Sequence, residues 1–537
     1  MKKQSFVFGA VLLAVSGIFC KILGAVYKIP LSNILGSQGM GIYYLIFPIY
    51  AFLLTLTSSS FSTAISKNVS EVLAENKKLY AHKIFKGSLI LLCILGSIAS
   101  CLLIALSHTI SHLQGLKSAR ICYIAIAPSI LLVAISSSFK GYFQGLQSMS
   151  PTAIAQILGQ LFKLSVGFLL AKVLSSKGVL FGTVGAFLGI TIAEVITCLF
   201  FIIYYFIFKF KHKNYFLFLG STQEEKSYTL KHIIKNLFYK SVPFILSSVI
   251  LPMSMVIDSF LIINILKSMQ FDKVFATSLL GLNSGIVNTL VSLPSTLSVA
   301  ICMTIVPYIS FALSKKDFVA INQKTALALK LTTLISLPCV FVFALFGKNI
   351  LSILYVGSFS SFYELEVAAT LLSLSSINVL YFALLQLSTA LLQSVNKAYI
   401  PVASLSFSLI LKVLFEIILI NNPYLNIAGA VVSNTICYIV SCCINIFSFK
   451  KYINTKFSFY QTVVCPLVAS FGMCLIIYFA KQIFSIFLGL TLSVVLSFIF
   501  GFIFYIVLVL SMKVFTFTEE QSLLFFKKFK IKRESKS

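Results

Sequence analysis

Residues 179–208 read VLFGTVGAFLGITIAEVITCLFFIIYYFIF, and Glu194 is the only charged side chain in this run of 30 residues. An α-helix rises about 1.5 Å per residue, so about 20 apolar residues cross the hydrocarbon core of a bilayer. A water-soluble helix of this length would carry one polar face, and this run has none. The run therefore predicts a transmembrane helix.

Similar apolar runs follow one another along the chain. Hydrophobic residues make up 59% of the 537 residues and charged residues only 10%, which excludes an ordinary soluble enzyme. Lys2 and Lys3 ahead of the first run imitate a secretory signal, but no small-residue cleavage site follows, so that run is also predicted to be a span. The sequence predicts an all-α polytopic membrane protein with about 14 transmembrane helices. The predicted spans are 6–27, 42–64, 87–106, 121–143, 152–174, 179–208, 241–266, 279–312, 325–347, 366–394, 400–420, 427–449, 461–480 and 487–512.

The charge distribution predicts the orientation. The chain has 42 basic and 14 acidic residues, a net charge of +28, which in a soluble protein would suggest a nucleic acid partner. With fourteen spans, 30 of the basic residues are counted in loops and termini on the side of both termini, Lys140 and Lys330 near span ends among them. Nine lie on the other side, and Lys21, Lys163 and Lys412 are counted inside spans. Because Lys and Arg collect in cytoplasmic loops, we expect both termini in the cytoplasm and no nucleic acid partner.

Two halves of the chain share short motifs. Residues 144–151 lead into a span that contains Lys163, and residues 393–401 lead into a span that contains Lys412. In the following spans, Gly185-Ala186 with Thr191 recurs 244 residues later as Gly429-Ala430 with Thr435. Since six spans per half is an even number, the two copies share one orientation, as in a parallel repeat.

This repeat predicts the domain organisation. The longest cytoplasmic connection separates the halves, and the basic tail is expected to lie as an amphipathic segment on the anionic inner leaflet, or else to bind a soluble partner. The predicted parts are an N-terminal six-helix lobe (1–208), a cytoplasmic linker (209–240), a C-terminal six-helix lobe (241–449), two extra transmembrane helices (450–512) and a basic cytoplasmic tail (513–537).

Lysines near the start of the chain are candidate substrate ligands. A charge inside a span is unfavourable unless it is paired or faces water, so such residues are functional candidates by default. Lys21 and Lys28 are seven residues apart, which places both on one helix face about 10 Å apart along the axis. That spacing suits a diphosphate. Alternatively, Lys28 extends to the outer membrane surface.

Lys163 is the third candidate substrate ligand. Glu194 lies in the next predicted span of the same half. The two residues are therefore candidates for an ion pair, which would give Glu194 a structural role.

A second group of polar residues falls in the second half. Lys412 and Glu416 are spaced i, i+4, which predicts a charge pair on one helix face. In the alternative interpretation, Glu416 joins Asp258, Asn434 and Thr435 in a site for a coupling ion or proton. Both interpretations remain open from the sequence.

Several classes of chemistry lack support. The 12 cysteines form no CxxC pair or zinc spacing and are predicted to be small core residues, and no nucleotide-binding loop occurs. The predicted outer loops are short, with Asp272, Glu364 and Glu366 as their acids, which argues against a membrane-embedded enzyme. We expect no catalytic residues, no metal and no cofactor.

Several motifs resemble a known family. They include Lys21-Ile-Leu-Gly24, the stretch Gly36-Ser-Gln-Gly-Met-Gly41-Ile-Tyr43 with Pro48, and Ala64-Ile-Ser-Lys67. In these segments the chain resembles the stage V sporulation protein B type polysaccharide biosynthesis proteins. These belong to the multidrug, oligosaccharidyl-lipid and polysaccharide exporter group, which includes the lipid II flippases.

The resemblance implies a V-shaped bundle of two six-helix lobes, with two further helices that form a groove for a lipid tail. It implies alternating-access transfer of an undecaprenyl-pyrophosphate-linked cell-wall precursor to the outer leaflet of the bacterial plasma membrane. Lys21 would line the central cavity, and Lys28 would follow it. Pro48 is not followed by the arginine of the better-studied lipid II flippases, so the cavity is less basic.

The implied partners are the lipid-linked glycan, membrane lipids, Na+ or H+, and cell-wall synthesis machinery. The alternatives are a flippase for another lipid-linked polysaccharide unit and a cation-coupled multidrug exporter. The four lysines and three acids in or at the ends of the spans give a net charge of +1, which favours an anionic substrate over a cationic drug.

Overall fold

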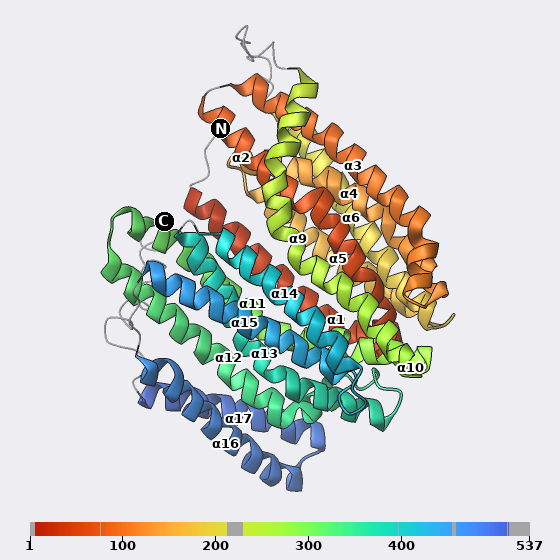
Figure 1. The fold of residues 1–537 in the computed structure, drawn as a ribbon, viewed down its shortest axis with the longest axis vertical. Coiled ribbons are helices and arrows are strands. Elements are labelled where there is room, and N and C mark those ends of the chain that lie inside the picture. The colour runs from red at the N-terminus through yellow and green to blue at the C-terminus, as the bar shows by residue number, and fades with distance from the viewer. Residues whose placement is uncertain are drawn as a thin grey trace. The chain divides into compact units, whose positions relative to one another are not determined.

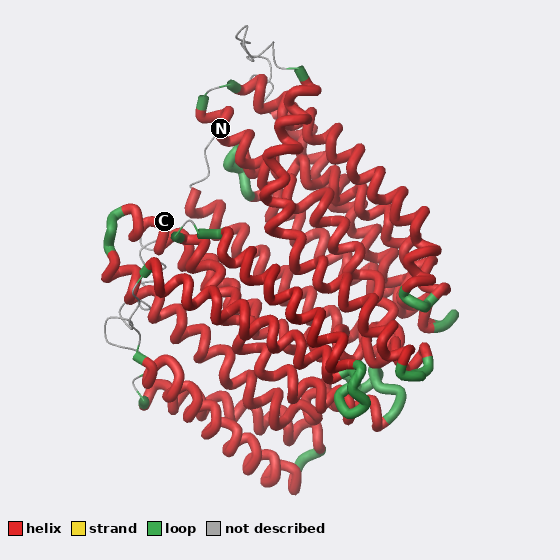
Figure 2. The backbone as a smooth tube through the Cα atoms, viewed as in Figure 1, coloured by secondary structure: helices red, strands yellow, loops and turns green. Residues whose placement is uncertain are grey.

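The computed structural model describes residues 6–75, 77–211, 229–395, 397–453, 458–512 and 514. Across these residues the regular elements are all helical (Figure 2), which confirms the predicted all-α class. Figure 1 shows the helices. They are α1 (Phe6–Leu54), η1 (Thr55–Ser59), α2 (Ser60–Ala74), α3 (Lys78–Leu113), η2 (Lys117–Ala119), α4 (Arg120–Gly145), α5 (Ser150–Ser175), α6 (Val179–Lys211), α9 (Leu230–Ser268), α10 (Lys273–Leu280), η3 (Gly281–Val287), α11 (Asn288–Ser314), α12 (Phe318–Leu354), α13 (Phe362–Ser394), α14 (Tyr399–Ile420), α15 (Ala428–Tyr452), η4 (Tyr460–Val464), α16 (Cys465–Phe487) and α17 (Leu490–Ser511).

Thirteen helical stretches of the described chain are long and apolar enough to cross a membrane. The first stretch, Val15–Ala74, is 60 residues long and contains the predicted span 42–64 and most of the predicted span 6–27. The other twelve match the remaining predicted spans one by one. The polytopic class is therefore confirmed, and the count of about 14 differs only because two spans form one helical stretch.

A single glycine divides that first stretch. Gly36 has φ +69° and ψ −179°, and α1 therefore consists of two helices that meet at this residue. Residues other than glycine rarely adopt this backbone conformation. In an unbroken helix, residues 28 and 44 would be about 24 Å apart along the axis. The side chains of Lys28 and Tyr44 instead touch, so the break folds the second part of α1 back toward the first.

The chain forms two compact units. The first comprises Met1–Thr289, Tyr355–Glu364 and Val413–Ala430, and the second comprises Leu290–Leu354, Leu365–Lys412 and Val431–Ser537. The boundaries expected at 208/241 and 449/450 stay a prediction. Residues 212–228 of the linker 209–240 and nearly all of the basic tail 513–537 lie outside the described residues, and α9 begins within that linker.

Close backbone packing holds the second part of α1 against α10 and η3 within the first unit. A Cβ atom at Gly41 would lie 1.9 Å from the carbonyl oxygen of Thr277, and one at Gly281 would lie 1.9 Å from that of Ser37. Only glycine permits such an approach, so these positions fix how α1 crosses η3.

The two motif glycines pack in the same way. A Cβ atom at Gly185 would meet the backbone of Leu170 near the end of the preceding helix, α5. A Cβ atom at Gly429 would meet the backbone of Leu419 near the end of its preceding helix, α14. Both glycines thus allow a helix to turn closely onto the one before it.

In the second unit, α16 and α17 pack against α12. The Tyr505 hydroxyl donates to the carbonyl oxygen of Leu334 at 2.7 Å. Lys330 Nζ donates to the carbonyl oxygen of Val514 at 2.8 Å and to Gln461 Oε1 at 3.2 Å. The charge count above placed Lys330 in a cytoplasmic loop, whereas it lies inside α12 with 3% of its surface exposed. Its side chain joins three segments and is not a free loop charge.

Candidate functional site

An aromatic row follows the break in α1. Tyr43, Tyr44 and Tyr50 are buried, and Phe47 is half-buried between them. Tyr43 stacks on Phe187 of α6 with ring centres 4.8 Å apart and an angle of 4° between the planes. These contacts fix the row against the first-half helices.

Lys28 is held by this row. Its Nζ donates to the Tyr44 hydroxyl at 2.7 Å and lies 5.3 Å from the centre of the same ring. These two distances place the ammonium group beyond the hydroxyl, at the edge of the ring and not over its face. Lys28 is half-buried, and its role, as a substrate ligand or as a lysine that extends to the outer surface, stays a prediction.

Lys163 approaches the row from α5. Its Nζ is 5.9 Å from the centre of the Phe47 ring. Its charge interacts with that of Lys28 and with that of Glu194 on α6. The structure therefore brings two of the three predicted substrate lysines into one electrostatic environment, and the expected partner Glu194 lies near them.

Glu194 also interacts with the charge of Lys140 on α4 and lies near Tyr50 on α1. Four helices thus meet around one carboxylate. The local balance of Lys28, Lys140 and Lys163 against Glu194 is positive, which favours an anionic ligand. The charge count above assigned Lys140 to a loop, and the structure places it inside α4.

Lys21 lies on α1 seven residues before Lys28, and both precede the break at Gly36. Its side chain is exposed in the protein alone. The expected shared helix face of Lys21 and Lys28 is compatible with these positions, and the role of Lys21 stays a prediction.

The residues of the predicted coupling site lie on three helices. Asp258 is half-buried on α9, and Glu416 is fully buried on α14, one turn after the buried Lys412. Asn434 and Thr435 are half-buried on α15, where the Thr435 hydroxyl donates to the carbonyl oxygen of Val431 at 2.9 Å. Both the charge pair and the coupling site stay predictions.

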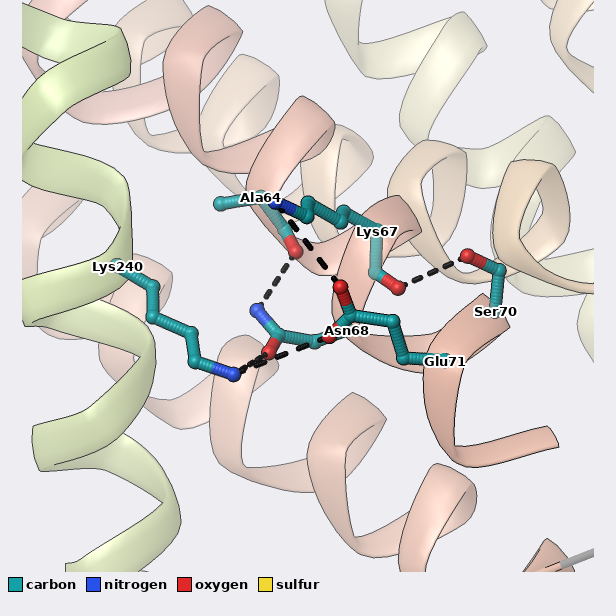
Figure 3. Close-up of polar contacts among 6 residues, drawn as sticks. All are labelled: Ala64, Lys67, Asn68, Ser70, Glu71 and Lys240. Atoms are coloured by element: carbon teal, nitrogen blue, oxygen red, sulfur yellow. Dashed lines mark hydrogen bonds and ion pairs between the residues drawn. The ribbon is translucent and has the colours of Figure 1, made fainter. Parts of the chain in front are cut away.

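A polar cleft lies between α2, α3 and the start of α9. Its volume is about 240 Å³, and its lining includes Asn68, Glu71, Glu75, Lys77 and Lys240. Figure 3 shows how Lys240 reaches from α9 to α2, where its Nζ donates to Asn68 Oδ1 at 2.7 Å and lies 3.9 Å from Glu71. The Asn68 amide is oriented for this contact because its nitrogen donates to the carbonyl oxygen of Ala64 at 2.8 Å.

Replacing Lys240 with alanine is expected to loosen the start of α9. The pair is partly exposed, so we expect a loss of about 0.5–1 kcal/mol and amide hydrogen exchange about two- to fivefold faster over residues 230–240. Hydrogen exchange with mass spectrometry measures this. Lys235→Ala removes an exposed lysine of the same helix and serves as the control. Equal exchange rates in both variants would show that the contacts of Lys240 do not stabilise the start of α9.

Two kinds of residue escaped the sequence analysis. Tyr44 and Phe47 were read as part of an apolar span, although each lies beside a candidate lysine. The aromatic spacing at 43, 44, 47 and 50 follows one helix face and was a usable signal. The buried Glu364 and its partner Ser37 are 327 residues apart, and no local pattern links them.

Comparison with known proteins identifies the family. Residues 6–313, more than half of the chain, match the family model described as polysaccharide biosynthesis protein. The chain belongs to this family.

Two curated relatives from Bacillus subtilis (strain 168) resemble this polysaccharide biosynthesis protein over most of its length. Stage V sporulation protein B is 26% identical over 433 residues, which are 80% of each chain. Lipid II flippase MurJ is 25% identical over 461 residues, which are 83% of this chain and 82% of the relative. The resemblance seen in the motifs is therefore confirmed.

Solved structures share the fold. The lipid II flippase MurJ in an inward closed conformation aligns with a TM-score of 0.66 and 17% identity over 94% of this chain and 99% of that one. An inward-facing multidrug resistance MATE family transporter aligns with a TM-score of 0.63 and 16% identity, over 81% of this chain and 94% of that one. This family member is thus a multi-pass membrane protein that shares the fold of these two solved structures.

Proposed function

We propose that this protein is a flippase that moves an undecaprenyl-pyrophosphate-linked cell-wall precursor, similar to lipid II, from the inner to the outer leaflet. The observation that carries the proposal is the pair of lysines, Lys28 and Lys163, whose charges interact beside the aromatic row of α1. Ammonium groups are strong ligands for phosphate oxygens. Lys21, about two helical turns before Lys28, supplies a third ammonium group to the proposed substrate path.

The chemistry of such a substrate explains why a protein of this kind is needed. A charged pyrophosphate-sugar headgroup cannot cross hydrocarbon alone, whereas its polyprenyl tail can stay in the lipid. A cationic, hydrated path that opens to one leaflet at a time removes that barrier. A membrane potential that is negative inside favours outward movement of the anion by about 2.3 kcal/mol per charge per 100 mV.

The same proposal places the protein in the bacterial plasma membrane with both termini in the cytoplasm. It assigns a modulating Na+ or H+ to Asp258, Glu416, Asn434 and Thr435. The full burial of Glu416 supports this assignment, because a buried carboxylate needs a counter-charge or a proton. Lys412, one turn away, is the alternative counter-charge.

Two other substrates fit the scaffold. Another undecaprenyl-linked glycan shares the pyrophosphate, so the same lysines would bind it. A cationic drug is favoured by the likeness to the MATE transporter and disfavoured by the positive local balance around Lys163. Cell-wall synthesis machinery is a candidate partner if lipid II is the substrate.

The test uses bacterial cells depleted of their own lipid II flippase. We expect the wild-type protein to restore lipid II on the outer face, and Lys163→Ala to reduce that restoration about tenfold through the loss of one charged hydrogen bond. Outer lipid II is measured by its accessibility to an added enzyme or antibiotic. Lys177→Ala removes an exposed lysine just after α5 and is the control.

The outcomes separate the substrates. Absence of restoration by a well-expressed wild-type protein would exclude lipid II, and the assay would then be repeated with other undecaprenyl-linked glycans. Restoration that Lys163→Ala leaves unchanged would remove Lys163 from the substrate path.

A further inference from the structure

The break in α1 is filled by a segment 326 residues further along the chain. Residues 355–364 comprise the connection between α12 and α13 and the first residues of α13, and the amide of Ser37 donates to the carbonyl oxygen of Ser358 at 2.9 Å. A helix that starts after a break has amide groups without a partner in its own first turn. The connection therefore supplies one of the hydrogen bonds that the break removes.

Side chains tighten this fit. The Ser358 hydroxyl lies 2.9 Å from Asn33 Oδ1 and 3.2 Å from the Ser32 hydroxyl. Gly357 lies so close that a Cβ atom there would be 2.7 Å from the carbonyl oxygen of Asn33. Ser32 and Ser358 are 0% and 1% exposed, so water does not enter this contact.

Glu364 fixes the other end of the connection. Its carboxylate is 6% exposed and accepts from the Ser37 hydroxyl, with oxygen distances of 2.9 and 3.0 Å, and from the Ser360 amide at 2.8 Å. Hydrogen bonds to a charged acceptor are about twice as strong as neutral ones. Ser37 thus bonds to the connection through both its backbone and its side chain.

The crossing order places this contact on one side of the membrane. The break lies between the first and second predicted spans, and residues 355–364 lie between the ninth and tenth. Both connections follow an odd number of crossings, so both lie opposite the termini, on the outer side in the orientation proposed above.

We propose that residues 355–364 form an outer seal that must leave the α1 break before substrate can exit. This inference rests on the proposed function, because a seal matters only if the path opens by alternating access. Ser32, Ser37, Ser358 and Glu364 hold it shut. Release would expose them to water, which can replace their hydrogen bonds, so the closed seal is reversible.

The first test locks the seal. The two serine hydroxyls are neighbours, so Ser32→Cys combined with Ser358→Cys places two thiols in reach of a disulfide. We expect oxidation to join the two peptides, as seen by mass spectrometry, and to lower outer-leaflet transfer at least tenfold. A reductant should restore it. Each single variant keeps the 12 native cysteines and is the control.

The second test does not depend on transport. Ser32→Cys is buried under the seal, and we expect a membrane-impermeant maleimide added outside intact cells to label it at least fivefold faster when Glu364→Ala is also present. Wild-type protein gives the background from native cysteines. Transfer that persists in a fully cross-linked protein, or labelling that Glu364→Ala leaves unchanged, would overturn the seal. Labelling from the inside only would place the contact on the other face and also overturn it.

If the wild-type protein moves no lipid-linked glycan, the proposed function fails, and the labelling still reports whether the connection opens.

Discussion

Lys28→Glu is expected to abolish transfer of a pyrophosphate-linked substrate. The variant removes an ammonium ligand and puts a carboxylate beside the Tyr44 hydroxyl, where the charge of residue 28 also acts on Lys163. Loss of a charged hydrogen bond together with repulsion of the phosphate amounts to about 3 kcal/mol, which corresponds to about a 100-fold loss of transfer. Transfer is measured as outer-leaflet substrate in flippase-depleted cells at matched protein levels.

A control is needed because charge reversal can also disturb folding. Lys177→Glu makes the same charge change at an exposed position just after α5 and is expected to transfer normally. Lys28→Arg keeps the charge and should retain most activity. Normal transfer by Lys28→Glu would remove the lysine from the substrate path. Equal losses in Lys28→Glu and Lys177→Glu would point to total charge and not to a site.

The fold was largely predictable because spans depend on local composition. Twenty apolar residues identify a helix wherever they occur, so the predicted spans and the described helices agree. The break at Gly36 is different. The sequence placed two spans on either side of a glycine-rich stretch, but the φ of +69° and the return of Tyr44 to Lys28 depend on contacts from residues 355–364.

The candidate site was predictable only in part, for a related reason. A lysine in an apolar run is conspicuous, so Lys28 and Lys163 could be chosen from the sequence. Their neighbours Tyr44 and Phe47 are ordinary residues of a span, and only the fold shows that each lies beside a lysine. Lys140 and Lys330 were assigned to loops because span boundaries are uncertain by a turn, and each lies inside a helix.

The crossing of α1 and η3 couples two contacts of the candidate site, that of Lys28 with Tyr44 and that of Lys163 with Phe47. Both lysine contacts depend on the second part of α1, which η3 and α10 hold from one side and residues 355–364 hold from the end at Gly36. A change in the crossing would therefore move Tyr44 and Phe47 together. Lys28 and Lys163 would then lose their positions at the same time, even though they lie on different helices.

Gly41→Ala tests that dependence and is expected to have the largest effect on stability. Its Cβ atom would lie 1.9 Å from the carbonyl oxygen of Thr277 and 2.7 Å from the carbonyl carbon, and backbone atoms cannot turn aside as a side chain can. Overpacking of this kind costs about 1–3 kcal/mol or more. We expect a clear fall in the midpoint of thermal unfolding in detergent, measured as loss of the monodisperse chromatographic peak, and a parallel loss of transfer.

Gly17→Ala is the matched control, because it adds the same methyl group to the same helix at a position where no heavy atom lies within 4 Å. Alanine has the higher helix propensity, so this variant should be unchanged or slightly more stable. If Gly41→Ala unfolds at the same temperature as Gly17→Ala, α1 and α10 do not approach as closely as described. If stability falls while transfer by the folded fraction stays normal, the crossing supports the fold but does not set the positions of Lys28 and Lys163.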